Sequence, residues 1–218
     1  MIRISEIFVG IQGEGKYVGT PMLFIRVSGC TRKCSWCDTK YHTKGKERKV
    51  EELVHKVTEV LFSNPSVKDI CFTGGEPLIY MEKIFHFINL LPTYKYHLET
   101  NGDLIKTPEK IIPLLTYFDY ISISPKTKDT AKKITEIIRD IDKIKIEWIN
   151  KIDIKVVTDL EKVGNDIIKY ATMLMPLTTY DEKKDKRIKR KVWEYCLMNG
   201  YKYSPRLQVD IWGKKKGK

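Results

Sequence analysis

Short apolar runs alternate with longer amphipathic stretches along most of the chain, and this alternation restricts the fold more than any other feature. The apolar runs predict buried strands over residues 22–29, 67–74, 95–102, 118–125, 153–158 and 172–177, and strand character over 201–213. Helical spacing and helix end signals predict helices over 48–62, 81–91, 108–115, 129–140, 160–171 and 184–200. Strands that alternate with helices imply a parallel sheet with right-handed crossovers, and they put an active site at the carboxyl ends of the strands.

The bulk composition bounds the class of protein. Apolar residues make up 42% of the 218 residues, enough for a sizeable core, and no apolar run approaches the length of a membrane span. The first residues lack the layout of a signal peptide, so we expect a cytoplasmic protein whose thiols stay reduced.

The formal charge of +12 raises the question of a nucleic-acid partner. Lys and Arg are spread widely, with concentrations at 183–191 and 214–218, and no helix-turn-helix or zinc-finger spacing accompanies them. We therefore favour a well-solvated, lysine-rich surface and expect neither a nucleic-acid nor a membrane partner. A positive field would also suit an anionic small substrate.

Three of the five cysteines lie together in "GCTRKCSWCDT", residues 29–39. Clustered thiols in a reducing compartment indicate a metal centre or redox chemistry. A structural zinc ion would need a fourth ligand. Cys71 lies in an apolar strand and Cys196 on a late helix, whereas His42 is near enough to keep a zinc site open.

The alternative is a [4Fe–4S] cluster held by Cys30, Cys34 and Cys37, which leaves one iron free for a ligand from outside the protein. A second motif, "TGGEP" at 73–77, follows a predicted strand. Its glycines would let the backbone approach a ligand closely, and a carbonyl or carboxylate there could accept hydrogen bonds from an ammonium group.

This cysteine spacing, with Trp36 before the third cysteine, and the glycine motif together resemble the signature of radical S-adenosylmethionine (SAM) enzymes. In that superfamily the free iron binds the amine and carboxylate of SAM, and electron transfer cleaves SAM into methionine and a 5′-deoxyadenosyl radical. The resemblance makes the three cysteines the catalytic cluster ligands.

Further stretches narrow the resemblance to the 7-carboxy-7-deazaguanine synthase family. They are "EIFVGIQGEGKYVGTPMLFIRVSGC", "CDT", "LETNG", "SISPK" and "PRLQVDIWGKKKG", and they span nearly the whole chain. The resemblance implies a single domain over 1–218, folded as an incomplete (β/α) barrel of the radical SAM type and usually paired as a homodimer. It also implies a one-electron donor such as flavodoxin or ferredoxin.

The family converts 6-carboxy-5,6,7,8-tetrahydropterin to 7-carboxy-7-deazaguanine with loss of ammonia, a step toward queuosine and archaeosine. Hydrogen abstraction at C6 starts a ring contraction, Mg²⁺ assists it, and SAM is regenerated. The resemblance assigns the substrate to Ile11, Gln12, Gly13, Glu14, Arg26 and Thr73, and Mg²⁺ to Thr39. It assigns SAM to Trp36, Cys37, Asp38, Gly75, Ser124, Pro125, Lys126, Met175, Pro176, Leu177 and Thr178.

Arg26 is the residue that the family match gives to the substrate carboxylate, which a fork-shaped cation suits. Two departures from the family pattern stand out. "MPLT" at 175–178 replaces "QPM", and Gln208 stands where many members have histidine, so it cannot act as a charge switch near neutral pH. The rival interpretations are a glycyl-radical-enzyme activase, which would share only the cysteine and glycine motifs, and a basic nucleic-acid-binding zinc module.

Overall fold

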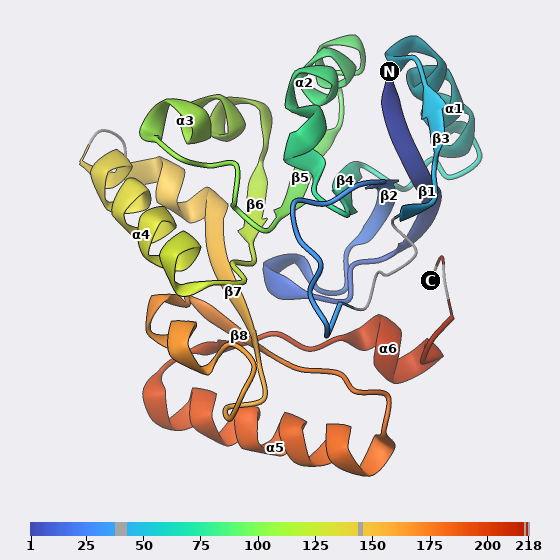
Figure 1. Cartoon of the computed structure of the whole chain (residues 1–218). Helices are drawn as coiled ribbons and strands as arrows, with labels where there is room; N and C mark the ends of the chain where they lie inside the picture. Colours follow the sequence, from blue (N-terminus) through green and yellow to red (C-terminus); the bar gives the residue numbers. More distant parts are fainter. Residues whose placement is uncertain (38–42, 144–145, 216, 218) are drawn as a thin grey trace.

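The computed structural model describes residues 1–37, 43–143, 146–215 and 217 (Figure 1). Its strands are β1 (Ile2–Ile11), β2 (Pro21–Val27), β3 (Lys46–Arg48), β4 (Asp69–Gly74), β5 (Lys95–Thr100), β6 (Tyr120–Ile123), β7 (Ile152–Thr158), β8 (Met173–Pro176) and β9 (Lys202–Tyr203). The α-helices are α1 (Val50–Phe62), α2 (Met81–Leu90), α3 (Pro108–Tyr117), α4 (Lys128–Asp142), α5 (Glu182–Asn199) and α6 (Leu207–Trp212). Short 3₁₀ turns are η1 (Gly15–Tyr17), η3 (Pro77–Tyr80), η4 (Ile146–Lys151) and η5 (Asn165–Tyr170).

All the strands join one sheet in the order β3-β1-β2-β4-β5-β6-β7-β8-β9. Neighbours from β2 to β9 run parallel, whereas β1 is antiparallel to both β2 and β3. Helices α1 to α4 follow one another along one side of the curved sheet, and α5 covers β8 (Figure 1). The sheet does not close, since β3 and β9 form opposite edges. The predicted incomplete (β/α) barrel is confirmed.

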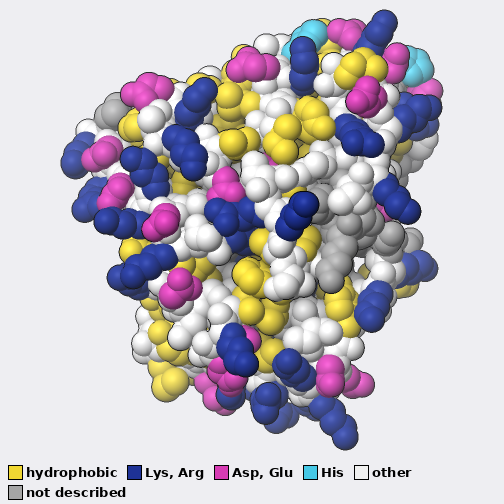
Figure 2. Space-filling view, viewed as in Figure 1, with side chains coloured by type: hydrophobic (Ala, Val, Ile, Leu, Met, Phe, Trp, Pro, Cys, Tyr) yellow, Lys and Arg dark blue, Asp and Glu magenta, His cyan; other side chains and the backbone are white. Residues whose placement is uncertain are grey.

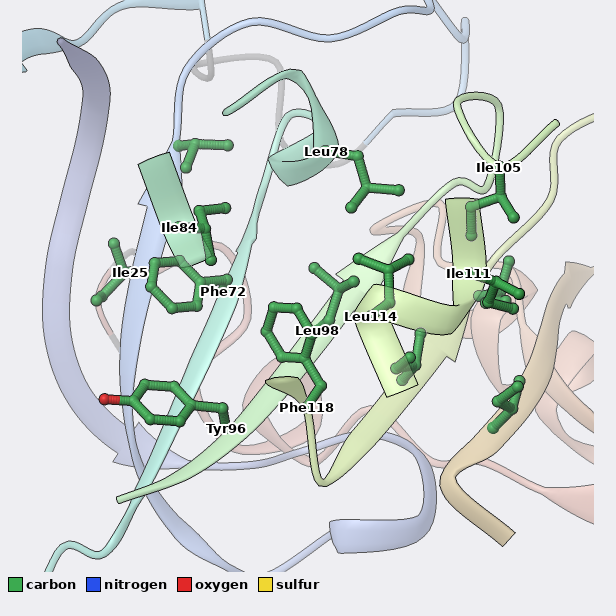
Figure 3. Packing of buried hydrophobic residues seen from close by; sticks show 14 of the residues in the cluster. Ile25, Phe72, Leu78, Ile84, Tyr96, Leu98, Ile105, Ile111, Leu114 and Phe118 are labelled. Carbon is green, nitrogen blue, oxygen red and sulfur yellow. The ribbon is translucent and has the colours of Figure 1, made fainter. Parts of the chain in front are cut away.

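The two faces of the sheet differ in chemistry because successive side chains along a strand point to opposite faces. Ile25, Phe72 and Leu98 are fully buried and pack with Ile84 of α2 and Leu114 of α3 on the helical side (Figure 3). The residues next to them on the strands belong to the other face. There Arg26 pairs in register with Thr73, and Glu99 with Ser122, so the strands themselves set polar groups side by side.

Local sequence explains most of the helices. In α1 the buried residues Val50, Leu53, Val57 and Leu61 recur at helical spacing. Thr127 caps the start of helix α4, since its hydroxyl accepts a hydrogen bond from the backbone N–H of Thr130. Gly200 follows the end of helix α5 in the left-handed conformation, which favours glycine.

Two predicted elements are wrong. Residues 160–171 form no α-helix: the Asp159 carboxylate accepts hydrogen bonds from three following backbone N–H groups, and a turn at Gly164 leads into η5. Such side-chain bonds compete with helix formation. Residues 201–213 give only the short strand β9 and then helix α6. The ten-residue strand β1 and the short β3 were not predicted.

The charged surface agrees with the expectation of a solvated face. Figure 2 shows Lys and Arg side chains spread over the visible face with Asp and Glu among them, not gathered in one stripe. Among the described residues, no helix has both the length and the apolar character needed to cross a membrane.

Candidate active site

A cavity of about 450 Å³ opens at the carboxyl ends of the parallel strands, where the chain's alternation predicted an active site. The predicted site residues that line it are Ile11, Gln12, Gly13, Glu14, Arg26, Cys30, Cys34, Trp36, Cys37, Thr73, Gly75, Ser124, Lys126, Met175, Leu177 and Thr178. Pro125 and Pro176 do not line it. Asp38 and Thr39 lie outside the described residues, as does the zinc candidate His42.

The cysteine loop follows β2 and presents three partly exposed thiols to one end of this cavity. Among the described residues, no three Cys, His, Asp or Glu side chains lie close enough to share one metal ion. A [4Fe–4S] cube takes each cysteine on a different iron and therefore spreads its ligands more widely. The residues present fit such a cluster, with Cys71 and Cys196 buried elsewhere.

The glycine motif packs directly against the start of the cysteine loop. The backbone N–H of Gly75 donates to the Val27 carbonyl at 3.1 Å, and that of Glu76 donates to the Gly29 carbonyl at 2.8 Å. A Cβ on Gly75 would lie 1.7 Å from the Gly29 carbonyl oxygen, so only glycine fits there. The motif thus fixes where the cysteine loop begins.

The motif was expected to offer an ammonium group a carbonyl or a carboxylate, and the structure corrects the second alternative: the Glu76 carboxylate is not available to such a ligand. It is fully buried and lies outside the cavity lining. It accepts hydrogen bonds from the Thr100 hydroxyl at 2.6 Å and from the backbone N–H groups of Leu78 and Asn101. Burial is the main influence on this carboxyl and raises its pKa. Its role is to tie the glycine motif to the end of β5.

Glu14 forms the charged centre of the cavity floor. Its carboxylate accepts hydrogen bonds from Lys155 Nζ at 2.5 Å, Arg206 Nε at 3.1 Å and Gln208 Nε2 at 2.8 Å. Burial alone would raise the pKa of Glu14, but the charges of Lys155 and Arg206 outweigh it and hold that pKa well below its usual range. Burial likewise acts to lower the pKa of Lys155, and Glu14 and Glu99 more than reverse this, so the lysine stays charged.

Glu99 and Ser122 stand beside this centre. Glu99 accepts hydrogen bonds from the Thr73 hydroxyl at 2.6 Å and from Gln12 Nε2 at 3.2 Å. Two buried side-chain oxygens here have no hydrogen-bond partner: the Ser122 hydroxyl and the Oε1 atom of Gln208. Buried polar atoms are almost always paired in native proteins. Unpaired ones that line a cavity therefore indicate a hydrogen-bonding ligand.

Arg26 lies on the other wall, where β2 approaches the cysteine loop. Its Nε donates to Glu6 at 3.1 Å, and its guanidinium lies over the Phe8 ring, 5.8 Å from the centroid. Arg26 thus pairs with an acid and also lines the cavity, and its contact with a substrate carboxylate stays a prediction. Near the cluster end, Lys126 Nζ donates to Ser124 Oγ at 2.7 Å, which makes "SPK" a compact polar corner.

Sequence analysis missed several lining residues: Arg32, Glu99, Asn101, Ser122, Lys155, Tyr180, Arg206, Lys214 and Lys215. A usable signal existed for Lys155, the one basic residue in the largely apolar strand "IDIKVVT". The lysine-rich tail, which received no role, reaches the cavity, and Lys214 Nζ lies 5.0 Å from the Tyr180 ring centroid.

Comparison with known proteins identifies the family. The Radical SAM superfamily model matches residues 24–182. The 7-carboxy-7-deazaguanine synthase of Pyrobaculum aerophilum is 29% identical over all of this chain and 97% of its own length. The synthase of Halobacterium salinarum is 30% identical over 97% of this chain and 90% of its own length, and that of Thermoplasma acidophilum is 37% identical over 72% of each.

A solved structure supports the fold. The crystal structure of QueE from Escherichia coli superposes with a TM-score of 0.60 at 18% identity and covers 93% of this chain and 92% of that one. At that identity the likeness bears on the fold alone. From the superfamily match and the similarity to full-length relatives, we conclude that this chain belongs to the 7-carboxy-7-deazaguanine synthase family of radical SAM enzymes.

Proposed function

We propose that this chain converts 6-carboxy-5,6,7,8-tetrahydropterin to 7-carboxy-7-deazaguanine with release of ammonia. The observation that carries the proposal is a single cavity with three cysteines at one end and a charged, hydrogen-bonding floor at the other. Such a cavity suits a ligand of the pterin kind, which offers several donors and acceptors as well as a carboxylate.

Cys30, Cys34 and Cys37 would hold a [4Fe–4S] cluster, and SAM would bind beside it along Trp36, Gly75, Ser124 and Lys126. When bound, these groups supply the radical that takes a hydrogen atom from C6 of the substrate. The protein's part is to hold both ligands in one water-poor cavity. Leu177 and Thr178, which line the cavity after β8, would contact SAM through backbone groups, because this chain lacks the glutamine of "QPM".

The floor and walls of the cavity would orient the substrate. Arg26 would pair with the substrate carboxylate, because a guanidinium binds a carboxylate through two donors. Gln12 and Thr73 carry polar groups already aligned by Glu99. The unpaired Ser122 Oγ and Gln208 Oε1 would gain partners from the pterin edge. Glu14 would hold its charge throughout, since Lys155 and Arg206 both stabilise the carboxylate.

Mg²⁺ would bind with Thr39 and substrate oxygens, since it favours hard oxygen ligands and rarely takes its whole shell from protein. We also propose a homodimer, a flavodoxin or ferredoxin as electron donor, and residues 1–218 acting as one domain. The single sheet that joins β1 to β9 supports the last of these.

The test is turnover under exclusion of oxygen. Protein reconstituted with iron and sulfide is incubated with SAM, dithionite, Mg²⁺ and the carboxytetrahydropterin, and the deazaguanine product is followed by liquid chromatography and mass spectrometry. We expect product from the unaltered chain and none from Cys34→Ala. The rate of Thr39→Ala should respond less to added Mg²⁺.

Two outcomes would overturn the proposal. Iron-loaded protein that cleaves SAM but leaves the pterin unchanged would favour a different radical SAM reaction, such as activation of a glycyl-radical enzyme. Protein that takes up one zinc and no iron would remove the cluster itself.

A further inference from the structure

Arg32 lies inside the cysteine loop, between the first and second cysteines, and makes a two-point ion pair with a residue far away in the sequence. Its Nε donates to Asp103 Oδ2 and its Nη2 to Asp103 Oδ1, both at 2.6 Å. The side chains are 27% and 11% exposed respectively, so water screens the pair only in part. Fork-to-fork pairs of this kind fix orientation as well as distance.

Asp103 is itself held from two sides. Its carboxylate also accepts hydrogen bonds from the Thr31 hydroxyl at 2.9 Å and from the Thr130 hydroxyl of α4 at 3.0 Å. Its backbone N–H donates to Asn101 Oδ1 at 2.8 Å. The carboxylate is therefore a fixed anchor for the Arg32 guanidinium, which also donates to the hydroxyls of Thr127 and Thr130 at 3.4 Å.

The anchor reaches the cysteine loop by a second route. Asn101 Nδ2 donates to the Thr31 hydroxyl at 2.9 Å and lies 3.8 Å from Cys30 Sγ. The end of β5 thus contacts three consecutive residues of the loop, of which only Arg32 is charged. Neutral side chains could hold the loop in the same shape. The positive charge of Arg32 therefore needs a separate explanation.

The pair lies directly beside the cysteines. Arg32 stands two positions from both Cys30 and Cys34, and its backbone N–H donates to Cys30 Sγ at 3.5 Å. Asp103 accepts a hydrogen bond from Thr31, the residue between Cys30 and Arg32, and Arg32 lines the same cavity as the three cysteines. A group bound by these thiolates would therefore lie within the field of the pair.

We propose that Arg32 is a positioning residue that sets the reduction potential of the cluster, and that Asp103 fixes where this positive charge lies and partly cancels it. The proposal rests on the proposed function in one respect, that the three cysteines hold a [4Fe–4S] cluster. Reduction adds a negative charge to the cluster, so a nearby cation stabilises the reduced form and raises the potential, and a nearby anion lowers it.

The test uses the full chain reconstituted without oxygen, with the cluster potential measured by spectroelectrochemical titration, before and after SAM is added. Arg32→Gln removes the cation and should shift the potential to a more negative value. Asp103→Asn keeps the shape but removes the anion, and it should shift the potential to a more positive value. Thr130→Val, the matched control, removes a hydroxyl that donates to Asp103 and accepts from Arg32 and Thr127. It loosens the pair without changing charge and should leave the potential nearly unaltered.

Opposite shifts in the two charge variants distinguish this proposal from simple loosening of the loop. Shifts in the same direction, or no shift, would overturn it. Failure of the unaltered chain to bind four irons would instead contradict the proposed function, and this is measured first by iron and sulfide analysis.

A further variant covers the case in which Arg32→Gln takes up no iron. Arg32→Lys keeps the charge but loses the two-point pair, so it should release iron to a chelator several-fold faster than the unaltered protein, while its potential should shift less than that of Asp103→Asn because the cation is kept. A potential shift as large as that of Asp103→Asn would refute the charge assignment, and an unchanged rate of iron release would refute the positioning role.

Discussion

The substitution Glu14→Gln should strongly destabilise the protein, although the two side chains have nearly the same shape. The carboxylate of Glu14 accepts hydrogen bonds from two cations and one amide, and the Lys155 and Arg206 side chains are 6% and 8% exposed. A glutamine has one oxygen and an NH₂ group, so at least one of the cations would face a donor. Removing one partner of a buried ion pair costs about 3–5 kcal/mol, mostly because the remaining charge is left buried and uncompensated.

This loss is large enough to measure by heat denaturation. For a chain of this size each 1 kcal/mol lowers the melting temperature by about 2–4 °C, so the expected decrease is roughly 6–20 °C. The assay is anaerobic thermal unfolding followed by far-ultraviolet circular dichroism at neutral pH. Glu161→Gln is the matched control: its pair with Lys191 has a similar length, 2.8 Å, but the side chains are 56% and 47% exposed. The melting temperature of this variant should therefore stay close to that of the unaltered protein, because exposed ion pairs contribute little to stability.

The pH dependence provides the second check. Because the folded-state pKa of Glu14 is depressed, its ionised form contributes stability fully above the ordinary pKa of 4.5, and this contribution is lost as the pH falls toward the depressed value. The difference between the unaltered protein and Glu14→Gln should therefore stay constant near neutral pH and shrink in acid. A loss no greater than that of Glu161→Gln, or a difference that grows in acid, would refute the reasoning.

Three further predictions concern the cavity walls. Arg26→Ala should weaken binding of the carboxytetrahydropterin at least tenfold while iron content stays normal, as measured by anaerobic calorimetry; unchanged affinity would exclude a carboxylate contact. Ser122→Ala should leave the melting temperature nearly unchanged, since no protein partner is lost, but should weaken substrate binding by about 0.5–1.5 kcal/mol in the same titration; equal affinity would contradict the contact. Gly75→Ala, whose new Cβ would meet the Gly29 carbonyl, should lower iron content and destabilise the fold by about 1–3 kcal/mol, and full iron loading would show that the loop can yield there.

Much of the fold was predictable because its signals are local. The spacing of apolar residues predicts the strands and helices. The alternation of strands with helices predicts that the strands run parallel. The two errors, at 160–171 and 201–213, fall where local signals conflict. Apolar spacing predicted a helix across Gly164. Instead, the backbone N–H groups of residues 161–163, which would form the first turn of that helix, donate to the Asp159 carboxylate.

The candidate site divides in the same way. The sequence by itself determined the three clustered cysteines, the glycines that let the backbone approach, and the arginine ahead of the loop, because each belongs to a short contiguous motif whose chemistry depends on spacing. It gave no indication that Glu14 would meet Lys155, 141 residues away, or that Arg32 would meet Asp103, 71 residues away.

Those contacts were decided by the tertiary structure alone. Strand order and register bring β2, β5 and β7 to one cavity, and a shift of one residue would turn every polar side chain to the helical face. Whether a charge is buried, paired or free to meet a ligand depends on neighbours that only the folded chain supplies. For that reason the cluster motif can be read from residues 29–39, whereas its electrostatic setting cannot.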